Sequence, residues 1–165
     1  MRIADWLDRF AIITGHTVKW LAILMLLVQF GIVISRYAFG VNSIAVQELV
    51  LYLHASHFMI AAAYTLQVDG HVRVDIFYAR FTPKNKALID IVGHLIFLLP
   101  AMCTILYFTW PSVRNAWAIK EGAISVGGLP ASFLLKTLIP VFCVLLILQS
   151  ISCLVRNFHS YFEKA

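Results

Sequence analysis

Ionisable side chains occur within long apolar stretches of this 165-residue chain. Glu48 stands near one end of such a stretch, and His54 and His57 follow it. Asp90 and His94 are four residues apart in another stretch, a spacing that places them on one face of a helix. In hydrocarbon, a carboxylate can bind an ion or relay a proton, and facing imidazoles can ligate haem. Each of these residues is therefore a functional candidate.

Structural roles compete with these chemical ones. We expect Glu48 to pair with Arg36 across a short connection in preference to contacting a substrate or an ion. Asp90 and His94 could hydrogen-bond each other. Gln29, beside the small residues Gly31 and Ser35, is typical of close helix packing with an interhelical hydrogen bond.

No catalytic pattern accompanies these residues in the sequence. There is no nucleophile elbow, phosphate loop, pair of carboxylates on one helix or metal-spaced Cys/His cluster. The three cysteines all fall inside apolar stretches, which argues against a disulfide framework. The sequence therefore predicts a protein that is not an enzyme and that holds no cofactor or metal.

The elements that must position the polar residues are four apolar stretches, at roughly 20–37, 44–66, 87–110 and 133–155. Each has the length with which an α-helix crosses about 30 Å of hydrocarbon. Hydrophobic residues make up 61% of the chain, against about 45–50% in soluble domains. We predict an all-α integral membrane protein, a single domain over residues 1–165 with four transmembrane helices. The first span is too long for a signal-peptide core and no A-x-A-like site follows it, so we expect it to be retained.

Loop charges predict the orientation. Four spans place both termini on one side, and nine Lys and Arg residues fall on that side against four on the other. By the positive-inside rule both termini of this multi-pass membrane protein face the cytoplasm. This rule also accounts for the net charge of +5, so we expect no nucleic-acid partner.

Two flanking segments have the pattern of short amphipathic helices lying at the membrane surface. In residues 3–13, apolar side chains recur at helical spacing, opposite Arg2, Asp5 and Arg9. Between the second and third spans, Arg73, Arg80 and Lys84 would form one basic stripe on a helix that ends at Thr82-Pro83. That stripe suits either a lipid-phosphate anchor or a docking face for another membrane protein.

Several short motifs carry a resemblance to a known family. They are Arg36-Tyr37-x-Phe39-Gly40, Glu48-Leu49, Ala62-Ala63-Tyr64, Gly70-His71-Val72-Arg73-Val74-Asp75, Gly128-Leu129-Pro130 and Ile139-Pro140. Together they resemble the small membrane subunit of tripartite ATP-independent periplasmic (TRAP) transporters, the DctQ-like proteins. The similarity covers nearly the whole chain, and the stretch from His71 to Asp75 is its most specific part.

The resemblance implies a non-catalytic subunit of a sodium-driven importer of organic acids. Its partners would be a large multi-spanning membrane subunit, which carries the substrate and sodium sites and moves like an elevator, and a periplasmic solute-binding protein. The small subunit would enlarge the static scaffold. Residues expected to face the large subunit or membrane lipids are Arg36, Glu48, His71, Arg73, Asp75, Phe77, Arg80, Phe81 and Lys84.

The sequence departs from the family pattern at the start of the second span, where a tryptophan and two consecutive carboxylates are common. Here Gln47 replaces one acid, and Asp69 stands where a glycine is common. A role that needs two carboxylates is therefore in doubt. Two other functions stay open at this point: a haem-binding membrane anchor of an oxidoreductase, and a small self-assembling exporter that uses Glu48.

Overall fold

The computed structural model describes residues 2–71, 78 and 80–163, and every regular element in those ranges is a helix. The elements are α1 (Arg2–Phe39), α2 (Ile44–Gln67), α4 (Pro83–Val92), the π-helical segment η1 (Gly93–Leu98), α5 (Leu99–Ala118) and α6 (Ser132–Glu163). Four stretches are long and apolar enough to span a membrane: Arg2–Phe39, Ile44–Gln67, Pro83–Ala118 and Ser132–Phe162. The predicted helical fold with four spans is confirmed.

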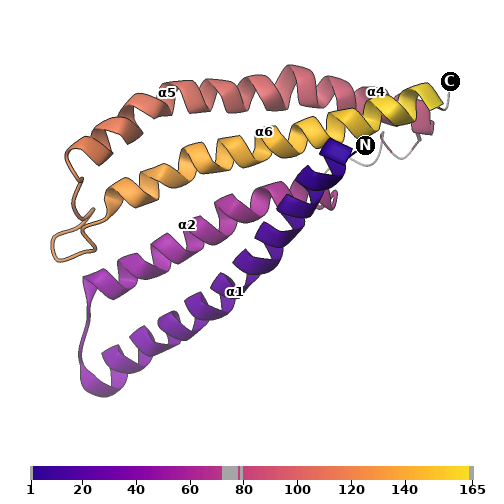
Figure 1. Cartoon of the computed structure of the whole chain (residues 1–165). Coiled ribbons are helices and arrows are strands. Elements are labelled where there is room, and N and C mark those ends of the chain that lie inside the picture. Colours follow the sequence, from indigo (N-terminus) through magenta and orange to yellow (C-terminus); the bar gives the residue numbers. More distant parts are fainter. Residues whose placement is uncertain (1, 72–77, 79, 164–165) are drawn as a thin grey trace.

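The helices form two antiparallel hairpins, α1–α2 and α5–α6 (Figure 1). Both chain ends lie at one end of the molecule, and the α1–α2 and α5–α6 connections lie at the other (Figure 1). This arrangement agrees with four spans and two termini on one side. Which side faces the cytoplasm stays a prediction.

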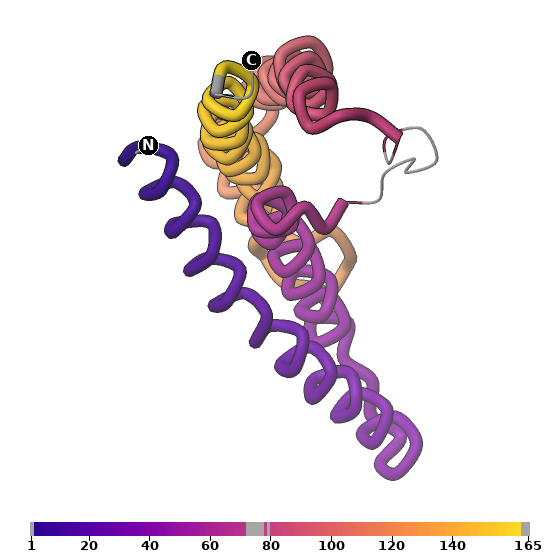
Figure 2. The backbone as a smooth tube through the Cα atoms, turned by 90° about the vertical axis from the view of Figure 1, so that its right-hand side faces the viewer, coloured from indigo at the N-terminus to yellow at the C-terminus, as the bar shows by residue number. Residues whose placement is uncertain are grey.

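Helix α6 is the central element, because α1, α2, α4 and α5 all pack against it. Met102 of α5 and Cys143 and Leu146 of α6 form a small buried cluster. Most other apolar side chains are exposed, as expected where lipid replaces water as the solvent. Helix α1 approaches α6 near its N-terminus and diverges from it toward the α1–α2 turn (Figures 1 and 2).

The N-terminal segment differs from the prediction. Residues 3–13 do not form a separate surface helix; they are the first turns of α1, which continues unbroken for 38 residues. No proline interrupts the backbone hydrogen bonds between Arg2 and Phe39. The small residues Ala4 and Ala11 are buried, whereas Trp6 and Ile13 are exposed. The apolar face predicted for this segment therefore points outward, and a face of small residues packs inward.

Thr82 and Pro83 mark the start of α4, so the chain has a helix boundary at the predicted place, but Lys84 lies in α4 and not on one helix with Arg80. The Thr82 hydroxyl accepts a hydrogen bond from the Asn85 backbone N–H at 3.4 Å, and Pro83 occupies the first turn. Proline suits that position because its missing N–H would have no partner there.

A π-helical segment precedes Pro100. Pro100 has no backbone N–H and its ring crowds the preceding turn, so the helix widens just before it. At the end of η1 the Leu99 N–H donates to the His94 carbonyl, five residues back.

Candidate functional site

Glu48 joins α2 to the connection between α5 and α6. One carboxylate oxygen accepts a hydrogen bond from the Ser125 N–H at 3.0 Å, and the other accepts one from the Leu129 N–H at 2.7 Å. The side chain is buried although it carries a carboxylate. The two backbone hydrogen bonds give each carboxylate oxygen a partner in this buried position. We call this contact the Glu48 clamp.

The predicted ion pair between Glu48 and Arg36 is wrong. Both Glu48 oxygens are bound to the backbone of residues 125–129, and Arg36 is exposed at the end of α1. Gly128 explains part of this preference, because a Cβ atom there would overlap the Glu48 carboxylate. Only glycine leaves room for the acid to reach the loop backbone.

Further contacts order the same end of the molecule. Lys136 of α6 forms an ion pair with Glu121 at 2.6 Å, and the Trp117 indole N–H donates to the Thr137 hydroxyl at 2.8 Å. The ion pair holds the α5–α6 connection against α6, and the Trp117 hydrogen bond joins α5 to α6 beside it.

A second polar cluster joins the two chain ends. Asp8 of α1 accepts hydrogen bonds from Gln149 at 2.8 Å, from Ser152 at 2.6 Å and from the Arg156 Nε at 2.7 Å. Arg156 also donates to Asp5 at 2.8 Å. Asp8 is 8% exposed, so the cluster closes a buried contact between α1 and α6. We call it the Asp8 lock.

Both oxygens of the buried Asp8 carboxylate have partners on α6. One oxygen accepts from Gln149 and Ser152, and the other accepts from Arg156. Separating α1 from α6 would leave all of these groups without partners.

The sequence prediction missed the Asp8 lock. One signal was present: Ala4, Ala11 and Gly15 recur at the spacing of one helix face, and Asp8 lies among them. Small residues let another backbone approach closely, so an acid in that row faces a neighbouring helix. The partners of Asp8 lie at positions 149, 152 and 156 of α6. Residues three or four apart lie on one face of a helix, so these three side chains share a face.

The other polar residues of the spans meet different helices. His57 contacts the Val18 carbonyl of α1 through Nδ1 at 3.1 Å, and His94 contacts the Ser150 hydroxyl of α6 at 2.9 Å. Asp90 accepts a hydrogen bond from the Tyr78 hydroxyl at 2.9 Å. His54 is exposed and stacks on Phe58. The imidazoles therefore do not face one another as a haem-ligating pair would require.

Two packing predictions for the first span do not hold within this chain. Gln29 is exposed, and a Cβ atom added to Gly31 would meet open space. The close glycine contact of α1 lies instead at Gly15, where an added Cβ would overlap the Tyr64 ring of α2.

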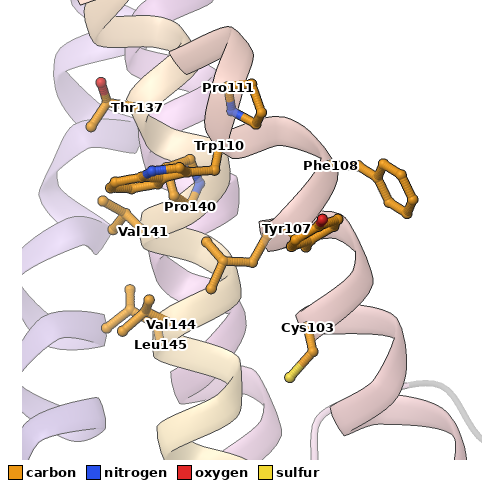
Figure 3. A pocket seen from close by; sticks show the side chains of 11 residues that line it. Cys103, Tyr107, Phe108, Trp110, Pro111, Thr137, Pro140, Val141, Val144 and Leu145 are labelled. Carbon is orange, nitrogen blue, oxygen red and sulfur yellow. The ribbon is translucent and has the colours of Figure 1, made fainter. Parts of the chain in front are cut away.

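An open apolar groove of about 830 Å³ lies between α5 and α6. Figure 3 shows Trp110 and Tyr107 of α5 and Pro140 and Val141 of α6 among the lining side chains. The hydroxyl of Thr137, at its edge, already bonds to the Phe133 carbonyl and the Trp117 indole. The lining offers contact to hydrocarbon and no arrangement of groups for catalysis.

A family model described as tripartite ATP-independent periplasmic transporters, DctQ component, matches residues 25–160. The chain belongs to the DctQ family. A search among curated proteins found no match. A DctQ protein is a small membrane component of a TRAP transporter and not an enzyme, and it functions with a large membrane component and a periplasmic solute-binding component.

The family match contains the Glu48 clamp completely, because residues 48 and 125–129 all lie within it. It contains Gln149, Ser152 and Arg156 but begins after Asp8. The Asp8 lock therefore joins the matched part of this DctQ chain to the turns that precede it.

The predicted interface residues of the DctQ chain are dispersed. Arg73, Asp75 and Phe77 lie outside the described residues. His71 lines a small cavity of about 370 Å³ together with Asp90 and His94. The other residues of the predicted segment have different surroundings: Arg80 and Phe81 are exposed, and the Lys84 ammonium lies 5.0 Å from the centre of the Tyr161 ring. Their role toward the large component or lipid stays a prediction.

Proposed function

We propose that this chain is the static scaffold subunit of a sodium-driven TRAP importer of organic acids. It would hold the large elevator-type subunit in the inner membrane, with both of its own termini in the cytoplasm. The transport path and the substrate and sodium sites would lie in that larger partner.

The observation that carries the proposal is that the chain is tied together at both ends of its helix bundle. The Glu48 clamp fixes α2 to the α5–α6 connection, and the Asp8 lock fixes α1 to α6 at the opposite end. A subunit against which another domain slides has to resist displacement of its own helices. Buried hydrogen-bonded acids at both ends provide that resistance, since separating the helices would leave the acids and their donors without partners.

The polar residues of the spans support the same role. His57, His94 and Gln149 form contacts between helices of this chain. Side chains committed to internal contacts are not available to coordinate a solute along a path. The scaffold proposal therefore fits better than the exporter alternative, in which Glu48 would have to reach a translocated substrate.

The importer can be tested by reconstitution into liposomes. The large subunit, the solute-binding protein and an organic acid would be combined with or without this chain, and solute uptake measured under an inward sodium gradient. We expect uptake when all components are present, loss of uptake without this chain or without sodium, and none by this chain alone. Transport by this chain alone, or full uptake in its absence, would contradict the scaffold role.

The segment from His71 to Lys84 has its own test. Arg73→Ala should reduce co-purification with the large subunit if the basic stripe docks a protein. If the substitution changes only the lipid dependence of activity, the stripe is a lipid anchor.

A further inference from the structure

Two polar side chains in the middle of the spans point out of the bundle. Gln29 of α1 and His54 of α2 are both exposed. Other polar groups of the spans form contacts inside the chain, as His57, His94 and Gln149 show. An amide or imidazole that faces lipid lacks hydrogen-bonding partners, and such residues mark functional contacts.

Both residues lie on the same face of the α1–α2 hairpin. A groove of about 700 Å³ between the two helices is lined by Gln29, Phe30 and Val33 of α1 and by Val50 of α2. His54 follows Val50 by four residues, and residues so spaced share one helix face. We call the surface formed by these five residues the Gln29–His54 face.

The two polar groups lie about one helical turn apart in height. Gly15 of α1 packs against Tyr64 of α2, and in the same antiparallel register Gln29 lies level with Val50, with which it lines the groove. His54 is four residues, or about one turn, beyond Val50. A neighbouring helix could therefore reach both groups with side chains from adjacent turns.

This part of the molecule has little cover from its own chain. The buried residues of α1 end at Val18, and beyond that point the helix diverges from α6 (Figures 1 and 2). From Trp20 to Phe39 no described residue of α1 is buried. The ring of Phe58 stacks beside His54 and extends the apolar border of the face.

We propose that the Gln29–His54 face docks a transmembrane helix of the large membrane component. This inference rests on the proposed function, which requires a membrane partner held from the side. The docked helix would carry a polar side chain at mid-depth, such as serine, threonine, asparagine or glutamine. Gln29 can supply two donors and one acceptor, and a neutral His54 supplies one of each.

The chemistry favours a protein helix over lipid. Acyl chains have no donors or acceptors, so they cannot satisfy the amide and the imidazole at this depth. A helix seated in the groove can, while Phe30 and Val33 pack against its apolar residues. Polar residues commonly join transmembrane helices in this way.

Crosslinking can locate the partner directly. A photoreactive phenylalanine analogue would replace Phe30 on the face, and as a control Phe108, an exposed residue of α5 that lies outside the Gln29–His54 face. Both variants would be co-expressed with the large membrane component and irradiated in membranes. We expect an adduct with the large component from position 30 and not from position 108. An adduct from position 30 only with lipid or with a second copy of this chain would overturn the inference.

Substitution provides a second measurement. The double variant Q29L/H54L makes both spans more apolar, so membrane insertion and folding should be preserved. We expect its affinity for the large component to fall about tenfold through the lost interhelical hydrogen bonds. T104V, which also removes an exposed polar group, but from α5, should leave the affinity unchanged.

The outcomes separate the two proposals. Binding that survives Q29L/H54L unchanged would overturn the docking face and leave the scaffold function standing. Failure of the unsubstituted chain to bind the large component would overturn both.

Discussion

The Glu48 carboxylate accepts the backbone N–H of Leu129 at 2.7 Å, although 80 residues separate them in the sequence. This bond fixes one end of α2 to the α5–α6 connection. A buried acid bound to backbone donors is costly to remove, because the contact between α2 and this connection is lost with it.

Glu48→Ala should therefore destabilise the protein by about 1–3 kcal/mol, since two part-buried N–H groups lose their charged acceptor. The measurement is the thermal unfolding midpoint in detergent, together with the rate of proteolysis within residues 119–131. Glu121→Gln is the matched control. It weakens a partly exposed ion pair with Lys136 and should cost about 0–1 kcal/mol. Equal losses of stability for the two variants would show that the Glu48 clamp stabilises the protein no more than the partly exposed ion pair does.

Gly128→Ala should damage the same contact from the other side. Its added Cβ would overlap the Glu48 carboxylate, so the acid or the loop has to move. In a double-mutant cycle with Glu48→Ala, the two losses should not add, because the second change acts on a contact already lost. Gly122→Ala is the control, since a Cβ there meets open space. Additive losses would mean that Gly128 acts independently of Glu48.

Asp8→Asn should destabilise the protein by about 1–3 kcal/mol, because an amide nitrogen would replace an acceptor facing Arg156 or Ser152. Asp5→Asn is the control at an exposed carboxylate and should cost less. The difference would be measured as thermal midpoints in the same detergent. A larger loss for Asp5→Asn would show that the exposed acid holds the chain ends together.

The sequence predicted the helices well and their polar contacts poorly, for a physical reason. Apolar length is a property of one segment, so the spans around residues 44–66 and 133–155 could be assigned from hydropathy alone. A buried acid's partner is set by how helices pack. Glu48 and Gly128-Leu129-Pro130 were both recognised as motifs, yet nothing in either indicates that they meet. Proximity along the chain favoured Arg36 instead.

The first span shows the same limit for small residues. Gly31 and Ser35 have the spacing of a packing pair, as do Ala11 and Gly15. Only the second pair is used within the chain, because α1 is covered near its N-terminus and diverges from α6 further along. Spacing indicates that close approach is feasible, and the path of the neighbouring helix decides where it occurs.

Alanine substitutions at the two glycines of α1 should therefore have opposite effects. At Gly15 an added Cβ would overlap the Cβ and Cγ atoms of Tyr64, close to the α2 backbone. The ring cannot swing clear by a small rotation, so α1 and α2 have to separate, at a cost of about 1–3 kcal/mol. At Gly31 the added Cβ meets open space, and alanine favours the helix by about 0.5–1 kcal/mol. Thermal midpoints in detergent should therefore fall for Gly15→Ala and hold or rise for Gly31→Ala. A loss at Gly31 in the isolated chain would place a close helix contact where the structure has none, and would contradict the divergence of α1 from α6.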